Sequence, residues 1–197
     1  TLRFYGIVYA IGYVVISIIL SKQKIKNLTK ERAYDIAFWG MLFGIIGARI
    51  YHVISDFHLY KDNLIGIFQI WNGGLGFFGG LIGGVLAIYL YCRKHKIDFI
   101  KVMDAISAPL IFFVALGRIA NFINSEHLGY PTSLPWCVKY LRIDDVCRHP
   151  TQIYEAISMF ALFIVLKFRK DNIFKIALLG YGIARFLTEF FRESTRI

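Results

Sequence analysis

Residues 102–127 read VMDAISAPLIFFVALGRIANFINSEH, and this stretch decides the fold. It begins as an apolar run long enough for the ~20 residues that a helix needs to cross a bilayer. The run ends on Arg118, Asn121 and Asn124, whose spacing of three places them on one face of a helix. A charged side chain at this depth costs about 3 kcal/mol on the insertion scale, so it indicates a functional site. The alternative is an arginine that only snorkels from a helix end.

The composition is that of a membrane protein. Hydrophobic residues make up 57% of the 197 residues, yet the formal net charge is +10. A chain that is both apolar and basic is typical of an integral membrane protein with basic cytoplasmic loops. The basic residues are spread over short loops, which argues against nucleic-acid binding. We therefore expect a single integral membrane domain over residues 1–197.

Six apolar segments, most of them close to the length of a membrane span, follow one another along the chain. They cover residues 4–20, 33–54, 75–92, 102–123, 151–166 and 176–191. The predicted fold is all-α, a polytopic transmembrane helical bundle of about six spans. The first segment does not read as a cleavable signal peptide, because SKQK follows it rather than a small-residue cleavage site.

Lysine and arginine are concentrated in alternate loops, those after the first, third and fifth spans. Because basic loops face the cytoplasm, we expect both termini and a long loop at about residues 125–150 on the extracytoplasmic side. Arg118, Arg185 and Arg192 then lie at the same side. Cys137 and Cys147 fall in the long loop, where a disulfide is permitted, and the sequence leaves their pairing open.

A glycine-rich segment opens the third span at residues 71–84, WNGGLGFFGGLIGG. It lacks the preceding strand and the Gly-Lys-Ser of a phosphate-binding loop. Two interpretations remain open. The small residues let two helices approach closely, or bare backbone at Gly79 and Gly80 admits a lipid headgroup at a helix start.

Two further clusters carry buried charge. Residues 148–155, RHPTQIYE, predict a helix start at Pro150, with Glu155 one turn deeper. A carboxylate there needs a cation, which Arg118 or Arg185 can supply. Near the other end of the chain Tyr181, Arg185 and Glu189 follow at intervals of four and share a helix face. The Arg185–Glu189 pair is either functional or purely structural.

Together these segments resemble one family. RFYGIVYAIG, WNGGLGFFGGLIGG, GRIANFINSEHLGYPT, RHPTQIYEA and GYGIARFLTEFFRE, in this order, are similar to motifs of the prolipoprotein diacylglyceryl transferases. The resemblance implies a multi-pass enzyme of the bacterial inner membrane, active at its extracytoplasmic side. It implies transfer of the diacylglyceryl group of phosphatidylglycerol to the lipobox cysteine thiol of a prolipoprotein signal peptide. It implies no cofactor, and no metal-ligand spacing is present in the sequence.

The resemblance also implies site residues. Arg118 matches the essential arginine that binds phosphatidylglycerol, and Arg185 matches a second essential arginine. Two guanidinium groups suit a phosphate, which they can bind through paired hydrogen bonds. The other expected substrate-binding residues are Tyr5, Gly79, Gly80, Asn121, Asn124, Glu126, His149, Glu155, Tyr181 and Glu189.

The chain departs from the family pattern in three ways. Phe78 stands where the family has a histidine that is proposed as the base for the thiol. Arg3 replaces a second histidine, and the sequence ends after six spans where a seventh usually follows. One explanation is a replacement base, with His127 the candidate and His52 a second choice.

Other interpretations do not include diacylglyceryl transfer to a prolipoprotein. The chain could be a diverged phospholipid-binding relative with another acceptor, or an inactive relative in a larger complex. A small transporter is the alternative from another class, but the sequence shows no inverted repeat.

Overall fold

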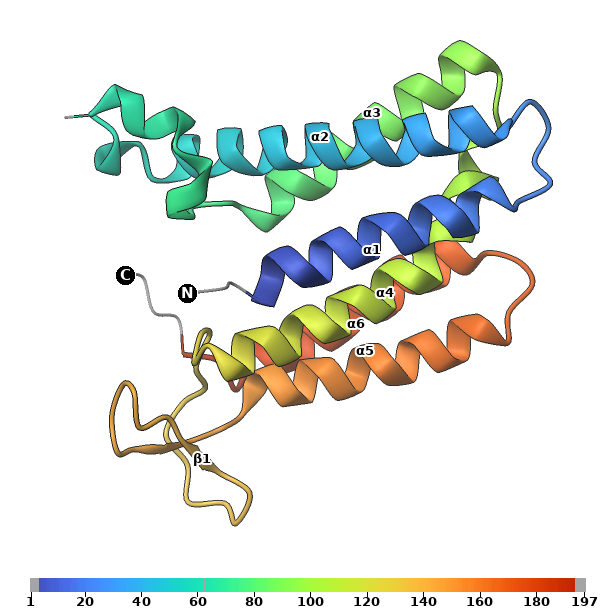
Figure 1. Cartoon of the computed structure of the whole chain (residues 1–197). Helices are drawn as coiled ribbons and strands as arrows, with labels where there is room; N and C mark the ends of the chain where they lie inside the picture. The colour runs from blue at the N-terminus through green and yellow to red at the C-terminus, as the bar shows by residue number, and fades with distance from the viewer. Residues whose placement is uncertain (1–3, 62, 194–197) are drawn as a thin grey trace. The chain divides into compact units, whose positions relative to one another are not determined.

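A computed structural model describes residues 4–61 and 63–193, without the side chains of residues 4, 5 and 72. The described chain is mainly helical, which confirms the predicted all-α fold. Its helices are α1 (Phe4–Ser21), α2 (Lys30–Ser55), α3 (Phe77–His95), α4 (Phe99–Ile123), α5 (Thr151–Lys167) and α6 (Ile173–Glu189) (Figure 1). Each predicted span coincides with one helix to within three residues at either end.

Helices α2, α3 and α4 are long and apolar enough to cross a membrane. Helix α1 contributes a shorter apolar stretch, Gly6–Ser21, and α5 and α6 have 17 residues each. Large apolar side chains on these helices point outward, as Ile82, Ile164 and Leu179 do. Such an apolar surface suits hydrocarbon rather than water. Helices also suit a bilayer, because they satisfy their own backbone hydrogen bonds.

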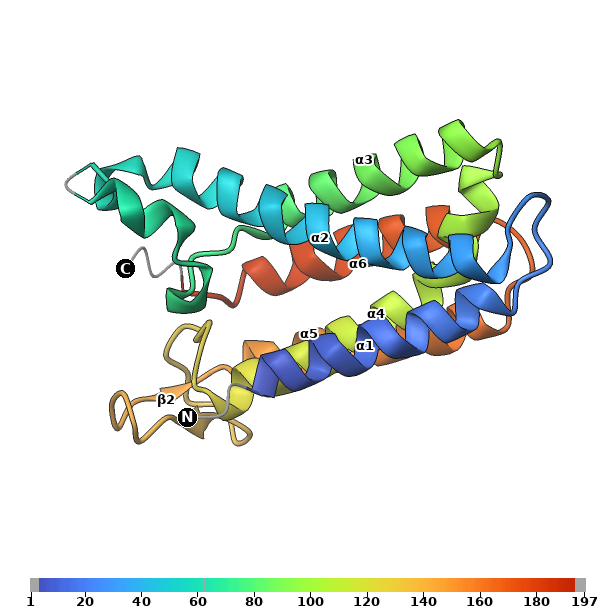
Figure 2. The same cartoon turned by 45° about the horizontal axis from the view of Figure 1, so that its top comes forward.

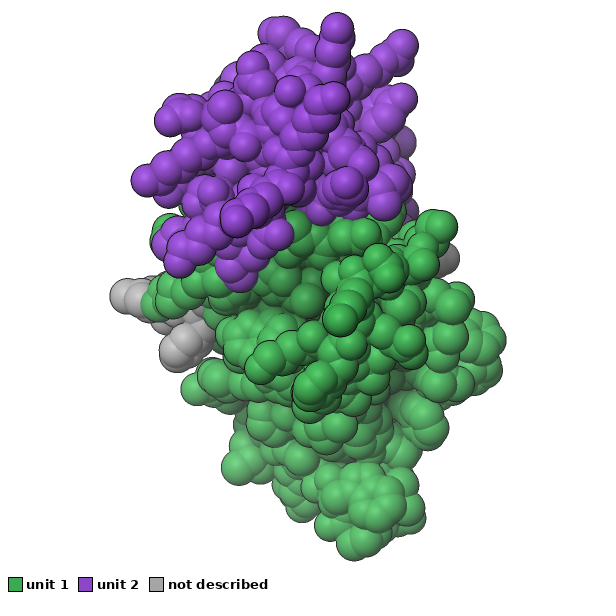
Figure 3. Space-filling view, turned by 90° about the vertical axis from the view of Figure 1, so that its right-hand side faces the viewer, with its two compact units in different colours: residues 1–16, 103–197 green, residues 17–102 purple. Residues whose placement is uncertain are grey.

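The chain forms two compact units, residues 1–16 with 103–197 and residues 17–102 (Figure 3). In the second unit α2 and α3 run alongside each other (Figures 1 and 2). Glycines on both helices make this approach possible. A Cβ on Gly47 would lie 2.3 Å from the carbonyl oxygen of Gly79, and one on Gly83 would lie 2.4 Å from that of Phe43. The glycine-rich segment therefore packs a helix against its neighbour, which is the first of its two interpretations.

A methyl group at this crossing tests how tight it is. We expect Gly47→Ala to destabilise the protein by about 1–3 kcal/mol, because the backbones must move apart. Gly182→Ala is the matched control, since a Cβ there meets nothing within 4 Å. Alanine favours a helix by up to about 1 kcal/mol over glycine, so the control should be neutral or stabilising. Melting temperatures in detergent micelles measure both, and a Gly47→Ala protein as stable as the wild type would contradict this packing.

The segment between α2 and α3 is organised around one buried arginine that the sequence did not single out. It contains three short 3₁₀ helices, η1 (Phe57–Leu59), η2 (Leu64–Phe68) and η3 (Ile70–Asn72). Arg49 donates hydrogen bonds of 2.6–3.4 Å to carbonyl oxygens of this segment, those of Gly66, Ile67, Gln69, Gly73 and Gly74. Its guanidinium also lies 5.1 Å from the centre of the Tyr60 ring. Arg49 thus joins η2 to the backbone that leads into α3 and gives carbonyl groups of this irregular segment a buried donor.

The first unit packs α4, α5 and α6 around a small apolar core. The buried core residues are Ile111, Ala115, Met159, Leu166 and Ala177. Helix α6 begins where the carboxylate of Asp104 in α4 accepts a 2.7 Å hydrogen bond from the backbone nitrogen of Phe174. Helix α5 begins at Thr151, directly after Pro150, as the sequence predicted.

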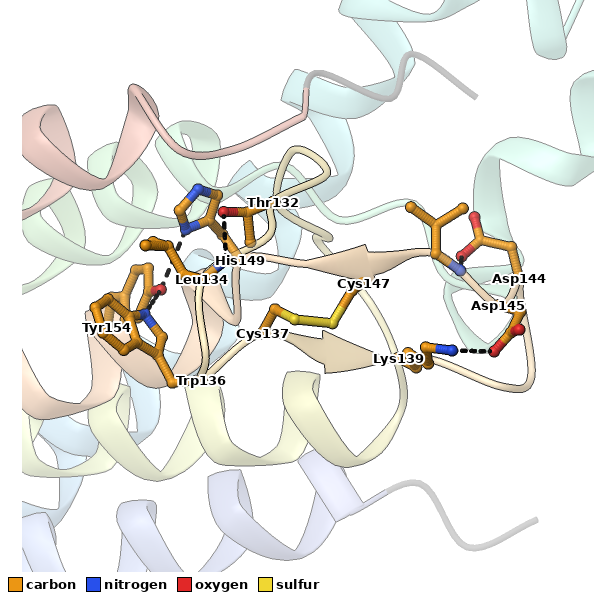
Figure 4. The surroundings of a disulfide bond; sticks show 11 residues. Thr132, Leu134, Trp136, Cys137, Lys139, Asp144, Asp145, Cys147, His149 and Tyr154 are labelled. Carbon is orange, nitrogen blue, oxygen red and sulfur yellow. Dashed lines mark hydrogen bonds and ion pairs between the residues drawn. A yellow bond between two sulfur atoms is a disulfide. The ribbon is translucent and has the colours of Figure 1, made fainter.

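The long loop between α4 and α5 is stiffened by a small hairpin. Strands β1 (Val138–Lys139) and β2 (Cys147–Arg148) pair antiparallel, and a disulfide joins Cys137 to Cys147 (Figure 4). An isolated bridge between Gly129 and Arg192 connects the loop to the segment after α6. The loop therefore holds residues from α4, α5 and the end of α6 in one place.

Candidate functional site

The centre of the candidate site is a buried carboxylate shared by two arginines. Glu155 on α5 is only 5% exposed. Its Oε2 lies 2.5 Å from Nε of Arg118 on α4, and its Oε1 lies 2.9 Å from Nη1 of Arg185 on α6. The hydroxyl of Thr188 donates a 3.3 Å hydrogen bond to the same Oε1. The expected cation partner of Glu155 is confirmed, and both candidate arginines serve.

The cluster continues toward the surface along α6. Nη2 of Arg185 lies 2.5 Å from Oε2 of Glu189, one helical turn on. The Glu189 side chain is 55% exposed, whereas that of Glu155 is 6% exposed. Tyr181, one turn earlier, lies within electrostatic range of Arg118 and Arg185. Tyr181, Arg185 and Glu189 therefore share the helix face that their spacing predicted.

This arrangement explains why charges persist in an apolar chain. Removing an ion from water costs several kcal/mol, which only a well-placed partner offsets. Here the two guanidiniums come from different helices, so Glu155 also fixes α4 and α6 relative to α5. Arg118 is 17% exposed and pairs inside its unit. It does not simply snorkel from a helix end.

The turn after α4 brings the predicted polar residues beside α5. Asn121 is buried. Its backbone carbonyl oxygen accepts a 3.0 Å hydrogen bond from the backbone nitrogen of Glu126. The side-chain amide of Gln152 donates to the Glu126 carbonyl, and the Thr151 hydroxyl donates to the His127 carbonyl at 3.0 Å. Asn124 lies in this turn and is half-buried.

His127 contacts an arginine rather than a carboxylate. Nη2 of Arg192 donates to its Nδ1 over 2.6 Å. Loss of hydration, followed by repulsion from Arg192, Arg118 and Arg185, lowers the pKa of His127 to about 4. The ring is therefore neutral near pH 7, with Nδ1 occupied as an acceptor. A group with so low a pKa is a weak base toward a thiol, whose pKa is ~8.5. The contact favours a positioning role, and the predicted base role stays a prediction.

The lowered pKa of His127 makes stability depend on pH. The unfolded chain takes up a proton near pH 6.5, whereas the folded chain resists it down to about pH 4. The contribution of neutral His127 to the free energy of unfolding is therefore fully present above pH 6.5 and is lost as the pH falls through 4. We expect the melting temperature to drop over this window by less in His127→Gln, which has no proton to gain. Equal pH slopes in the two proteins would contradict the lowered pKa.

His149 lies in an aromatic cluster at the start of α5. Its Nδ1 lies 3.2 Å from the hydroxyl of Tyr154, which accepts a 2.8 Å hydrogen bond from the Trp136 indole (Figure 4). The rings of His149 and Phe191 are 5.2 Å apart. Trp136 directly precedes Cys137 of the disulfide, so this cluster attaches the hairpin to the helices.

The remaining predicted residues belong to the other compact unit or fall outside the described side chains. Gly79 and Gly80 belong to the unit of residues 17–102, where both face α2. Phe78 is exposed on α3, and His52 pairs with Asp56 at 3.0 Å. The side chain of Tyr5 lies outside the described residues. Binding roles for these residues stay predictions.

Sequence reasoning assigned no site role to several polar residues of the cluster and of the loop segments that adjoin it. They are Thr188, Gln152, Arg148 and, as a site residue, Arg192. Arg148 pairs with Asp144 at 2.7 Å and with Glu193. Within residues 4–61 and 63–193 no group of three His, Cys, Asp or Glu side chains is placed to hold a metal ion.

Known sequences show which family the chain belongs to. The sequence model of the prolipoprotein diacylglyceryl transferase family matches residues 1–197. The chain belongs to this family. The protein is therefore a transferase, as the family is. Its long apolar helices make it a membrane protein.

Three relatives illustrate the match, each named phosphatidylglycerol–prolipoprotein diacylglyceryl transferase. The protein of Finegoldia magna is 35% identical over 98% of this chain and 80% of its own length. That of Pseudoalteromonas atlantica is 38% identical over 98% of this chain and 72% of its own length. That of Polynucleobacter necessarius is 36% identical over 98% of this chain and 79% of its own length. The match to these diacylglyceryl transferases therefore includes every helix of the cluster.

Proposed function

We propose that this protein transfers the diacylglyceryl group of phosphatidylglycerol to the thiol of a lipobox cysteine in a prolipoprotein. It acts in the bacterial inner membrane, with the arginine cluster at the extracytoplasmic side. Family membership supports the reaction, and the basic loops after alternate spans support the orientation. The observation that carries the proposal is the pair of guanidiniums, Arg118 and Arg185, held together by Glu155.

The chemistry requires help for a leaving group. The cysteine sulfur attacks the glyceryl carbon, a carbon–sulfur bond forms, and the bond from that carbon to the phosphate oxygen breaks. Glycerol phosphate departs with an added negative charge, and the thiol proton is released. Guanidinium groups aimed at this developing charge stabilise the transition state, more so in a site that excludes water. Because only a few per cent of a thiol is ionised at pH 7, close positioning of the sulfur matters as well.

The other predicted residues have binding roles in this proposal. Asn121, Asn124 and Glu126 line the turn beside Arg118, and Tyr181 and Glu189 flank Arg185. His149 supports the start of α5. Binding by Tyr5, Gly79 and Gly80, which the family resemblance implied, stays a prediction. His127 faces the cluster as a neutral ring.

Complementation tests the proposed function. A bacterium depleted of its own transferase should regain growth and lipid-modified lipoproteins when it expresses this chain. In a purified assay, phosphatidylglycerol and a lipobox peptide should give a thioether product, and a peptide with serine in place of the cysteine should give none. Good expression without transfer in either assay would instead favour a phospholipid-binding relative with another acceptor.

A further inference from the structure

The charge cluster contains a third arginine, just beyond α6. Arg192 is half-buried, and this burial together with Arg185 and Arg118 lowers its pKa, whereas Glu189 and Glu155 act in the opposite direction. All five charged side chains therefore belong to one electrostatic cluster.

The three arginines differ in their partners. Arg118 and Arg185 are ion-paired to Glu155, and Arg185 also to Glu189. Within residues 4–61 and 63–193, the Arg192 guanidinium donates a hydrogen bond to His127, whose ring is neutral at pH 7. Three guanidiniums against two carboxylates leave one positive charge, and its location is Arg192. A phosphodiester carries one negative charge, so the cluster and the headgroup match.

The backbone around Arg192 is fixed on both sides. Phe191 accepts a 2.9 Å hydrogen bond from the Tyr130 nitrogen, and the Glu193 nitrogen donates to the Leu128 carbonyl at 3.0 Å. The Glu193 carboxylate is ion-paired to Arg148. The Arg192 side chain is thus presented from an anchored segment, which lowers the entropy lost when it binds.

We propose that Arg192 is a third phosphate-binding residue, whose charge the phosphodiester neutralises and which retains contact with glycerol phosphate as it leaves. The inference rests on the proposed function. A phosphate displaces the neutral His127 acceptor at little cost, because no ion pair is broken. Displacing Glu155 would strand a buried carboxylate. Arg118 and Arg185 therefore keep their carboxylate while Arg192 turns to the ligand.

Two substitutions separate charge from structure. Arg192→Gln can still donate to His127 but has no charge, whereas Arg192→Lys keeps the charge. Arg142→Ala removes an exposed arginine of the loop between α4 and α5 and is the matched control. The readouts are the KM for phosphatidylglycerol, the inhibition constant of glycerol phosphate, and phosphatidylglycerol binding by native mass spectrometry with diacylglycerol as the uncharged comparator.

We expect Arg192→Gln to raise the KM for phosphatidylglycerol and the inhibition constant of glycerol phosphate about 10- to 100-fold, because a charge-assisted hydrogen bond is lost. The change in kcat should be smaller. Arg192→Lys should recover most of the affinity, and Arg142→Ala should match the wild type. If Arg192→Gln behaves as the wild type, or if only Arg192→Lys is impaired, the role is structural and the proposal fails. A wild-type protein that transfers nothing defeats the proposed function alone. The binding measurement then still decides Arg192, through selective loss of phosphatidylglycerol in Arg192→Gln.

Discussion

Arg118→Ala and Arg185→Ala are each expected to lower diacylglyceryl transfer by at least about 10²–10³-fold, the effect of removing one preorganised donor from a developing charge. Each substitution also leaves Glu155 with one guanidinium instead of two. The carboxylate then competes for the remaining cation and repels the phosphate. The loss should appear mainly in kcat/KM, since both the bound headgroup and the departing phosphate are affected.

Arg169→Ala is the control for this loss, because Arg169 is exposed in the turn between α5 and α6. Lysine at position 118 or 185 should restore only part of the rate, since an ammonium group lacks the planar fork of guanidinium. Transfer of a labelled diacylglyceryl group to a lipobox peptide measures all five proteins. Full turnover in both Arg118→Ala and Arg185→Ala would rule out the arginine pair as the phosphate clamp.

Glu155→Ala should be the most destabilising substitution in the cluster, by about 3–5 kcal/mol, because it removes the buried carboxylate that two partly buried cations share. Arg118 then loses its carboxylate, and Arg185 keeps only the exposed Glu189. The matched control is Glu189→Ala. The Glu189 side chain is 55% exposed and pairs with the same arginine, so its loss should cost about 0–1 kcal/mol. Melting temperatures in detergent, with phosphatidylglycerol absent, compare the two variants.

A double substitution sharpens this comparison. Glu155→Leu combined with Arg118→Leu removes a carboxylate and a guanidinium together, so it should cost less than Glu155→Leu alone. If Glu155→Ala and Glu189→Ala both have melting temperatures close to that of the wild type, the buried carboxylate does not hold α4, α5 and α6 together.

The six helices follow from the sequence because each is encoded locally, by an apolar run of suitable length between polar loops. The cluster followed for a similar reason. Tyr181, Arg185 and Glu189 share a face by spacing, and a carboxylate as deep as Glu155 needs a cation. The identity of that cation did not follow, and the structure uses two.

Other features depend on contacts between distant residues. Arg49 is bound to carbonyls 17 to 25 positions away, and Arg192 reaches His127 across 65 positions. No periodicity encodes such pairs. The small hairpin was equally hidden, since two-residue strands have no alternating pattern to detect. Only its two cysteines signalled a constraint.

The bond between Cys137 and Cys147 has a consequence for topology. Cytosolic glutathione and thioredoxin keep thiols reduced, so such a bond persists on the opposite, oxidising face of a membrane. The hairpin is thus a chemical marker of sidedness that is independent of where lysines and arginines lie. The proposed orientation therefore requires that the disulfide is intact in cells, and a reduced pair of cysteines would contradict it.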